Sequence, residues 1–319
     1  MRTMKNDRIS NLLVTGANGF VGQAFLDMLE EFDYNLRPNK ITLVGRSDRC
    51  PRDLSNFGNS ITYISADLTK TWDFDCGSAY VLNLAADGGP TSYSDTAAQD
   101  FEKINLNLST WAIKNKPSIV VHASTGACFG LKQLQNEEIR NQDATVELLR
   151  KKRFIESRIL AEKTLQKLQA EFGIPVSVCR LFSFVGKRLL EKKQYAISSF
   201  IDSAIREKRI IVKGNPKTVR SYLSEQDMST WLWSALKLPA SDEILSVGSS
   251  RGVTLGELAQ YIAGQTDSSI IYENPDAFGD EYVADNLKTL DFLNVSEGKL
   301  WEESTLECID FLRGIHERG

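Results

Sequence analysis

A glycine-rich segment near the amino end does most to narrow what this chain can fold into. Residues 12–22 read LLVTGANGFVG, an apolar run followed by three glycines spaced three residues apart, and an amphipathic helical pattern comes next. In a strand–turn–helix unit of this kind, Gly16 permits the tight turn, Gly19 lets the backbone approach a pyrophosphate, and Gly22 lets the helix pack closely. The amino end of such a helix offers N–H groups and a positive dipole end to phosphate oxygens. The segment predicts a dinucleotide-binding turn, with further contacts from Asn18, Phe20 and Val21.

Short apolar runs and helical patterns alternate through the first half of the chain. After the first strand, apolar runs lie at residues 41–44, 61–64, 80–84, 119–122 and 176–179, and helical patterns cover about residues 97–115 and 143–172. Strands separated by helices predict βαβ units around a buried parallel sheet, and right-handed crossovers place the helices on both of its faces. We therefore expect an α/β fold with a Rossmann-type doubly wound parallel sheet.

The pattern becomes more irregular after about Leu181, where turn signals such as Gly214-Asn215-Pro216 interrupt it. We expect a dinucleotide-binding Rossmann domain over residues 1–180, which regains part of residues 219–248. Residues 181–319 are expected to form a smaller substrate-binding lobe.

Charge and composition exclude several kinds of partner. The formal net charge of −4 argues against nucleic acid and anionic membranes, because no global positive field attracts either. Residues 1–10 are polar rather than the apolar core of a signal peptide, and no run approaches the roughly 18 apolar residues that span a bilayer. The five cysteines are far apart, and neither His122 nor His316 has a second plausible ligand nearby in the sequence. We expect a cytoplasmic protein without a metal site.

Five further segments carry a resemblance to a known family. They are residues 66–68 (ADL), 83–87 (NLAAD), 122–130 (HASTGACFG), 180–186 (RLFSFVG) and 219–227, which begin VRSYL. Together with the TGxxGxxG form of the glycine turn, they resemble the extended short-chain dehydrogenase/reductases, the NAD-dependent epimerases and dehydratases that modify nucleotide sugars. The resemblance runs from about residue 11 to residue 260, which is most of the chain.

The resemblance implies a bound nicotinamide dinucleotide. Asp67 falls at the family's adenine-contacting acidic position, and residues 83–87 match the strand-end segment that passes beside the cofactor. The cofactor contacts that the resemblance implies in these segments also include Leu68, Leu84, Ala85 and Ala86.

The resemblance also implies a nucleotide-sugar substrate and a partner copy. Arg220 resembles the residue that pairs with the substrate diphosphate, for which the guanidinium fork is well suited. Tyr195 lies where the family's nucleotide-binding segment enters the second lobe, and Asp87 and Thr91 are further substrate candidates. The two long helical patterns match a pair that often forms a dimer bundle in this family, so we expect a homodimer.

The end of the second strand favours NADP over NAD. A carboxylate at this place usually binds the adenine ribose, whereas a nearby arginine accommodates a 2′-phosphate. Here the acidic position holds Gly45, and Arg46 and Ser47 follow it, although Asp48 is close by. A guanidinium binds phosphate through paired hydrogen bonds, so Arg46 and Ser47 are expected to contact the cofactor.

The catalytic pattern of the family is broken in this chain. The family transfers a proton with a Tyr-x-x-x-Lys pair and a Ser or Thr, and Ser124 and Thr125 match the latter. At the position of the pair stand Phe154 and Arg158, and none of the nine tyrosines is followed by Lys at the fourth residue. Phenylalanine has no ionisable proton, and arginine stays protonated, although Arg158 can still neutralise charge and bind ribose hydroxyls.

Three explanations of this break remain open. Another residue can supply the proton transfer, the candidates being Ser124, Thr125, Asp87, Tyr93 and Tyr195. Alternatively, the reaction needs no strong base here, as when an acidic α-proton leaves a ketosugar. In the third case, catalysis is lost and the chain is a regulatory or interaction protein that binds NAD(P) or a nucleotide sugar. The sequence favours an active epimerase, 4,6-dehydratase or 4-ketosugar reductase with a non-standard acid/base site.

Overall fold

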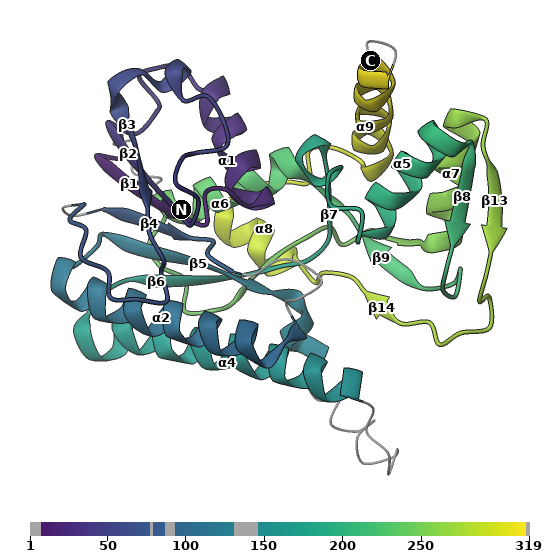
Figure 1. Ribbon diagram of the computed structural model, residues 1–319. Helices are drawn as coiled ribbons and strands as arrows, with labels where there is room; N and C mark the ends of the chain where they lie inside the picture. Colours follow the sequence, from purple (N-terminus) through teal and green to yellow (C-terminus); the bar gives the residue numbers. More distant parts are fainter. Residues whose placement is uncertain (1–7, 77–78, 87–92, 131–145, 317–319) are drawn as a thin grey trace. The chain divides into compact units, whose positions relative to one another are not determined.

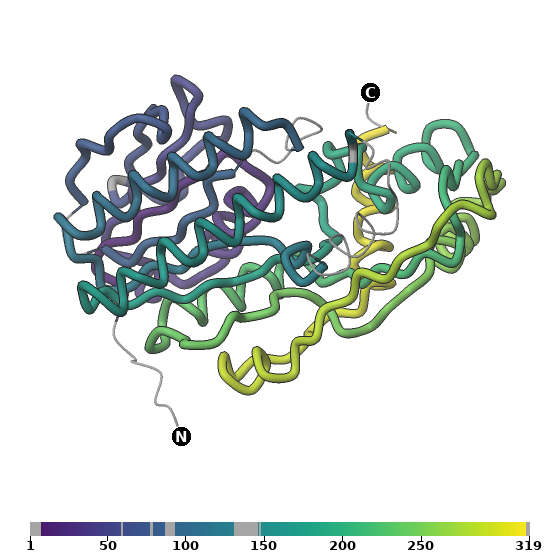
Figure 2. The backbone as a smooth tube through the Cα atoms, turned by 90° about the horizontal axis from the view of Figure 1, so that it is seen from below, coloured from purple at the N-terminus to yellow at the C-terminus, as the bar shows by residue number. Residues whose placement is uncertain are grey.

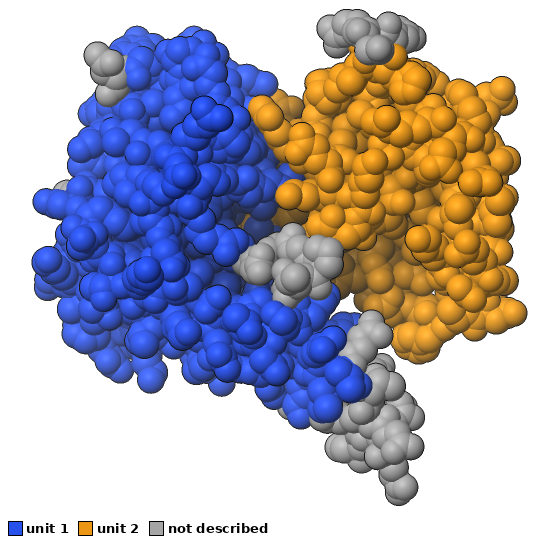
Figure 3. Space-filling view, viewed as in Figure 1, with its two compact units in different colours: residues 1–181, 230–245 blue, residues 182–229, 246–319 orange. Residues whose placement is uncertain are grey.

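The computed structural model describes residues 8–76, 79–86, 93–130 and 146–316. The chain forms two compact units, residues 1–181 with 230–245 and residues 182–229 with 246–319 (Figure 3). Each unit is therefore built from two separate stretches of the sequence.

A seven-stranded sheet forms the centre of the first unit (Figure 1). Its strands, in spatial order, are β11 (Leu245–Val247), β6 (Val176–Leu181), β5 (Ile119–Thr125), β4 (Tyr80–Asn83), β1 (Asn11–Thr15), β2 (Lys40–Gly45) and β3 (Ile61–Ser65). The neighbouring pairs from β6 to β3 are all parallel. The strand order reverses between β1 and β4, and doubly wound sheets bind ligands at such a point, beyond the carboxyl ends of the strands. The expected α/β fold with a doubly wound parallel sheet is confirmed.

Two long helices, α2 (Asp95–Asn115) and α4 (Val146–Phe172), lie side by side on one face of this sheet (Figures 1 and 2). Ser94 begins α2 by accepting a hydrogen bond from the N–H of Ala97, and Lys116 ends it in the left-handed conformation. Apolar side chains of both helices, such as Trp111 and Leu165, join those of the strands in one buried core. Both helices match the expected ranges closely, and residues 143–145 of the expected second helix lie outside the described residues.

The helices α1 (Phe20–Glu31) and α6 (Glu225–Lys237) pack together on the other face of the sheet (Figure 1). The indole of Trp233 contacts the rings of Phe25 and Phe32, with centroids 6.4 and 5.4 Å apart. Trp231, on the same helix, is 1% exposed and belongs to the core. These contacts hold α1, which follows the glycine turn, against α6.

The second unit combines helices with short strands. Its helices are α5 (Ala196–Glu207), α7 (Leu255–Thr266), α8 (Leu287–Leu293) and α9 (Trp301–His316). Its sheets pair β7 (Phe184–Val185) with β10 (Leu223–Ser224), β8 (Arg209–Val212) with β13 (Ser269–Tyr272), and β9 (Val219–Ser221) with both β12 (Gly252–Thr254) and β14 (Glu281–Tyr282). Short 3-10 helices lie at η1 (Ser55–Ser60) and η3 (Gly126–Gly130) in the first unit and at η4 (Lys187–Leu189) in the second.

Within the described ranges, no helix combines the length and the apolar character needed to cross a bilayer. The same residues contain no group of three or more His, Cys, Asp or Glu side chains that could hold a metal ion. All five cysteines are free thiols, and Cys76, Cys128, Cys179 and Cys308 are buried. The buried thiols act as small apolar side chains.

Candidate cofactor and active site

The glycine turn between β1 and α1 has no room for side chains at two of its glycines. Gly16 has a φ of +67°, and a Cβ there would lie 2.6 Å from the carbonyl carbon of Leu84. A Cβ on Gly22 would lie 2.7 Å from the Cα of Ala17, whereas a Cβ on Gly19 would meet the Gly16 carbonyl oxygen at 3.2 Å. The turn therefore runs directly against the segment that follows β4, and the first turn of α1 packs tightly on it.

The amino end of α1 suits an anion. Gly19 is the N-cap residue, and no side chain caps the helix, whose first turn begins with Phe20 and Val21. Asn18 donates from Nδ2 to the hydroxyl of Tyr63 at 2.8 Å, while its Oδ1 is buried without a hydrogen-bond partner among the described residues. An uncapped helix end attracts phosphate oxygens, and an unpaired buried acceptor is satisfied by a donor such as a ribose hydroxyl. These residues fit a dinucleotide.

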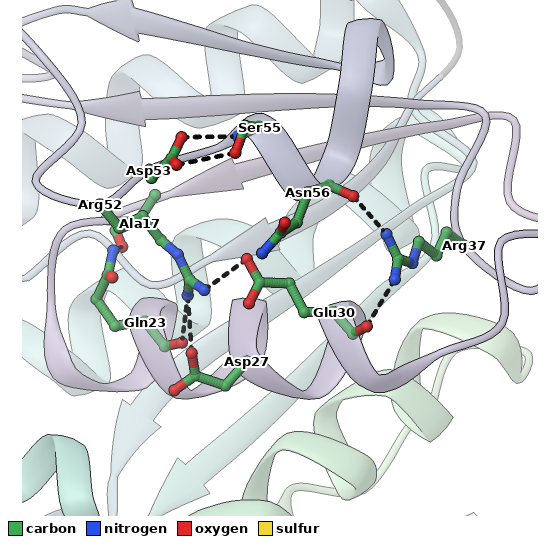
Figure 4. A network of polar contacts seen from close by, with 9 residues as sticks. All are labelled: Ala17, Gln23, Asp27, Glu30, Arg37, Arg52, Asp53, Ser55 and Asn56. Atoms are coloured by element: carbon green, nitrogen blue, oxygen red, sulfur yellow. Dashed lines mark hydrogen bonds and ion pairs between the residues drawn. The ribbon is translucent and has the colours of Figure 1, made fainter.

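Ion pairs connect the loop after β2 to α1 (Figure 4). Arg52 forms ion pairs with Asp27 at 2.9 Å and with Glu30 at 2.7 Å, and its side chain is 11% exposed. Arg46 and Ser47, near the start of this loop, are both exposed. The loop therefore holds the two expected cofactor contacts at the surface beyond the end of β2.

Asp67 lies in the turn after β3. Its Oδ1 accepts hydrogen bonds from the hydroxyl of Thr69 at 2.7 Å and from the Thr69 N–H at 3.1 Å, and these lower the pKa of the carboxyl. Asp67 is exposed and ionised, whereas Leu68 is buried and its carbonyl oxygen accepts a hydrogen bond from Trp72 Nε1 at 3.0 Å. Of these two expected contacts, only Asp67 presents its side chain at the surface.

The remaining expected cofactor contacts on this edge follow β4 directly. Ala85 is buried, and Ala86 beside it is exposed. Leu84 donates its N–H to the carbonyl oxygen of Thr15 at 3.2 Å, which ties the segment to the glycine turn. The structure therefore brings these three residues together with the turn.

A buried polar network joins β1, β4, β5 and α2. Asn83 accepts a hydrogen bond from the hydroxyl of Thr15 at 2.6 Å and donates to Asn105 Oδ1 at 3.0 Å. It also contacts His122 Nδ1 at 2.9 Å, and since the Asn83 amide nitrogen can only donate, this ring nitrogen accepts. His122 is 0% exposed, and its Nε2 has no partner among the described residues. Burial lowers the pKa of His122 to about 4.

Acid is expected to destabilise the first unit through His122. Its pKa is about 4 in the folded chain and about 6.5 for an unperturbed histidine, so between these values the unfolded chain binds a proton that the folded chain excludes. The free energy of unfolding should be fully retained above pH ~6.5 and fall by about 3 kcal/mol as the pH drops to ~4. Urea unfolding at each pH measures this loss. The free energy of unfolding should fall less between pH ~6.5 and ~4 for His122→Asn, which retains a hydrogen-bond acceptor, than for His316→Asn at the exposed end of α9. Equal falls in the two variants would contradict this origin.

Ser124 is held by a buried ion pair. Its hydroxyl donates to Glu162 Oε1 at 2.5 Å, and the Glu162 carboxylate accepts from Arg180 Nε at 2.9 Å and Nη2 at 2.7 Å. Thr125 instead accepts the N–H of Ala127 on its Oγ1 at 3.2 Å, an interaction that does not use its hydroxyl proton. Of the two adjacent candidates, Thr125 is therefore the better placed to donate a hydrogen bond to a ligand.

Arg158 is buried among aromatic rings. It is 3% exposed, and its Cζ lies 3.9 Å from the ring centroid of Phe101 and 4.1 Å from that of Phe154. The Phe154 ring also contacts that of Tyr93, with centroids 4.9 Å apart and planes inclined by 56°. The Phe-x-x-x-Arg pair thus provides a fixed cation and an aromatic surface, and Phe154 and Arg158 themselves supply no group that can transfer a proton.

The expected substrate contacts lie in other parts of the chain. Tyr195 precedes α5 and is 46% exposed, and Arg220 lies in β9, where its Nη2 donates to Asp280 Oδ1 at 2.7 Å. Both belong to the second unit. Asp87 and Thr91 lie outside the described residues.

Sequence reasoning assigned no role to Tyr63 or Glu162, although both shape the site. Glu162 follows Phe154 and Arg158 at intervals of four residues, which places all three on one face of α4. That spacing was a usable signal, because a carboxylate on a buried helix face needs a charged partner. Nothing local in the sequence indicated that the Tyr63 hydroxyl would meet Asn18.

Comparisons with known proteins identify the family. The model of the NAD dependent epimerase/dehydratase family matches residues 12–248, and the chain belongs to this family. The trifunctional UDP-glucose 4,6-dehydratase/UDP-4-keto-6-deoxy-D-glucose 3,5-epimerase/UDP-4-keto-L-rhamnose-reductase RHM2 of Arabidopsis thaliana is 22% identical in an alignment covering 94% of this chain. The chain spans about half, 47%, of that protein's length.

Solved structures share the whole fold. A UDP-N-acetylglucosamine 4-epimerase from Methanobrevibacter ruminantium, in complex with UDP-N-acetylmuramic acid, is 20% identical with a TM-score of 0.75, covering 98% of this chain and 100% of its own. MoeE5 in complex with UDP-glucose and NAD is 18% identical with a TM-score of 0.76, covering 96% of this chain and 100% of its own. The expected resemblance to the extended short-chain dehydrogenase/reductases is confirmed by the family match and by this fold.

Proposed function

We propose that this chain is a nicotinamide-dependent enzyme that modifies a nucleotide sugar by hydride exchange at a sugar carbon, as an epimerase, a 4,6-dehydratase or a 4-ketosugar reductase. The glycine turn carries the proposal, because only glycine fits at Gly16 and Gly22 and the helix end beyond them is uncapped. That geometry suits a pyrophosphate. Membership of an NAD dependent family supports the cofactor class, and the UDP-sugars held by similar structures support the substrate class.

The chain's own residues would bind and orient the cofactor from both sides of the sheet's switch point. The glycine turn would hold the pyrophosphate, and Asn18 would bind a ribose. Asp67 and Arg46 would contact the adenosine end of the cofactor, and Ala85 would contact the rest of the dinucleotide. When bound, the cofactor supplies the hydride acceptor and donor. Arg158, a buried cation, would favour negative charge on a nearby oxygen.

Thr125 and Arg220 would act on the substrate. The hydroxyl proton of Thr125 is not used in its bond with Ala127, so it can be donated to a sugar oxygen at the carboxyl end of β5. Arg220 would pair with the diphosphate through its guanidinium fork, exchanging its bond with Asp280 for bonds to phosphate oxygens. Tyr195 and Asp87 would supply further substrate contacts.

NADP should bind more tightly than NAD because Arg46, exposed directly after β2, would meet the 2′-phosphate. We expect Arg46→Ala to weaken NADP binding about tenfold or more, since a charge-assisted hydrogen bond contributes about 1.5–3 kcal/mol, and to leave NAD binding nearly unchanged. Calorimetric titration with each cofactor measures both affinities. Arg49→Ala, an exposed arginine in the same loop, serves as the matched control. A parent protein that prefers NAD would contradict the assignment.

The protein should form a homodimer through α2 and α4. Leu106 and Ile113 on α2 are 59% and 37% exposed, and Leu149 and Leu160 on α4 are 47% and 51% exposed. Their spacings of seven and eleven residues place each pair on one helix face. Light scattering should find a dimer that the double change Leu106→Glu and Leu160→Glu converts to a monomer. Leu36→Glu, at an equally exposed leucine elsewhere, should leave the dimer intact, and a monomeric parent protein would contradict the proposal.

A non-catalytic protein that binds NAD(P) or a nucleotide sugar is the second candidate, favoured by Phe154 and Arg158, neither of which can act as an acid or base at neutral pH. The test incubates the purified protein with NAD(H) or NADP(H) and a panel of UDP-, dTDP-, GDP- and CDP-sugars and their 4-keto forms. Mass spectrometry and chromatography then detect products. Conversion of at least one sugar is the expected result, whereas tight cofactor binding without any product would favour the second candidate.

A further inference from the structure

Hydride exchange at a sugar carbon also requires that the attached hydroxyl lose or gain a proton. The need for a proton acceptor rests on the proposed function. Neither Phe154 nor Arg158 can accept that proton. The acceptor must be an ionisable group that a ligand can reach beside these two residues.

The buried groups around Thr125 do not meet this condition. The hydroxyl of Ser124 donates to Glu162, and both oxygens of that carboxylate are engaged by Arg180. His122 is fully buried, and its pKa is lowered to about 4. Burial also raises the pKa of the Cys128 thiol to about 11, which keeps it protonated at neutral pH.

Tyr93 differs from these groups in its exposure. It is 46% exposed and carries a phenol, a group that can both accept and return a proton. The adjacent Ser94 fixes the backbone, because its side chain accepts the Ala97 N–H and begins α2 there. Since α2 follows β4 in the chain, this helix start belongs to the carboxyl edge of the sheet, where ligands bind in doubly wound folds.

The contacts of Phe154 connect Tyr93 to the expected reaction site. The ring centroids of Phe154 and Tyr93 are 4.9 Å apart, and the Arg158 guanidinium carbon lies 4.1 Å from the Phe154 centroid. Phe154 and Ala127, which is two residues after Thr125 in the chain, both pack against the buried pair Cys128 and Ile155. The Phe154 ring thus contacts the ring of Tyr93 and the guanidinium of Arg158, and it packs on the same buried pair as the segment that follows Thr125.

We propose that Tyr93 is the acid/base residue of this enzyme and that Phe154 is the surface on which its ring rests. In the oxidative direction, the Tyr93 phenolate oxygen takes the proton of the sugar hydroxyl. The C–H bond on the same carbon breaks, and its hydride passes to the oxidised nicotinamide cofactor, so the alcohol becomes a ketone and Tyr93 a neutral phenol. In the reductive direction, the hydride returns from the reduced cofactor to the carbon, and the Tyr93 phenol returns the proton to the oxygen.

Three variants test this assignment with NAD⁺ or NADP⁺ and UDP-glucose, or the best substrate of the panel. Tyr93→Phe should lower kcat about a hundredfold or more, while calorimetry shows unchanged affinities for cofactor and nucleotide sugar. Tyr34→Phe, at a tyrosine that is 67% exposed and contacts Arg8, should retain full activity. Adding Phe154→Tyr to Tyr93→Phe moves the phenol to the neighbouring ring and should restore a measurable part of kcat.

A second readout does not depend on turnover. Tetranitromethane nitrates exposed tyrosines, and peptide mass spectrometry reports each site separately. Nucleotide sugar and cofactor together should slow the nitration of Tyr93 and leave that of Tyr34 unchanged. If the parent protein converts a sugar and Tyr93→Phe keeps its kcat, or if ligand leaves Tyr93 nitration unaffected, the proposed function stands and this assignment is overturned. If the parent protein converts no sugar, both are overturned.

Discussion

Replacing Glu162 by alanine should lower the free energy of unfolding by about 3–5 kcal/mol, because it leaves a buried cation without its partner. The side chains of Glu162 and Arg180 are 3% and 10% exposed, and their ion-pair distance is 2.7 Å. The change also removes the acceptor of the Ser124 hydroxyl. Denaturant unfolding measures the loss.

The matched control is an exposed ion pair of the same kind. Glu207 and Arg209 form a pair at 3.3 Å with side chains 56% and 48% exposed. Glu207→Ala should change the free energy of unfolding by less than about 1 kcal/mol, since water screens such pairs. Similar losses for Glu162→Ala and Glu207→Ala would show that the buried ion pair does not hold β5, β6 and α4 together.

Gly16→Ala should weaken cofactor binding about a hundredfold or more, equivalent to about 2.7 kcal/mol, because the turn cannot keep its shape with a Cβ. The new atom would lie 2.6 Å from the carbonyl carbon and oxygen of Leu84, and neither backbone atom can swing away. The φ of +67° adds strain for any L side chain. Calorimetric titration with NAD and NADP measures the effect.

A control variant at Gly173 separates the effect of backbone strain from the effect of the steric clash at Gly16. Its φ is +66°, nearly that of Gly16, but a Cβ there meets nothing within 4 Å. Gly173→Ala should therefore cost about 1–2 kcal/mol of stability and leave cofactor affinity unchanged. Equal cofactor affinities in the Gly16→Ala and Gly173→Ala variants would show that the glycine turn is not the binding element.

The parts of the fold that the sequence predicted well depend on local signals. The glycine spacing, the apolar run before it and the helical pattern after it lie within one short segment, so β1, the turn and α1 could be placed from residues 12–22 onward. The alternation of strands and helices was sufficient to predict the doubly wound sheet, because the right-handed crossover rule allows few arrangements of the strands. These predictions needed no knowledge of distant contacts.

The detail of the site depends on contacts between distant segments, which local patterns do not contain. Ser124 and Thr125 are adjacent and equally plausible in the sequence, and only Glu162 and Arg180, from α4 and β6, distinguish them. Likewise, the ring contact of Tyr93 with Phe154 joins the start of α2 to α4. The bond between Arg220 and Asp280 was also not predictable from either segment alone.

The central claim is that this chain exchanges a hydride with a nucleotide sugar although Phe154 stands at the position of the expected tyrosine. The most direct measurement mixes the protein, saturated with NAD⁺ or NADP⁺, with each nucleotide sugar of the panel and follows the absorbance of reduced nicotinamide from the first turnover. We predict that at least one sugar produces reduced cofactor, transiently for an epimerase or dehydratase, and that Gly16→Ala strongly lowers the signal at the same cofactor concentration. A protein that binds both ligands and never reduces the cofactor, nor oxidises NADH or NADPH with any 4-ketosugar, would contradict the claim and identify a binding protein.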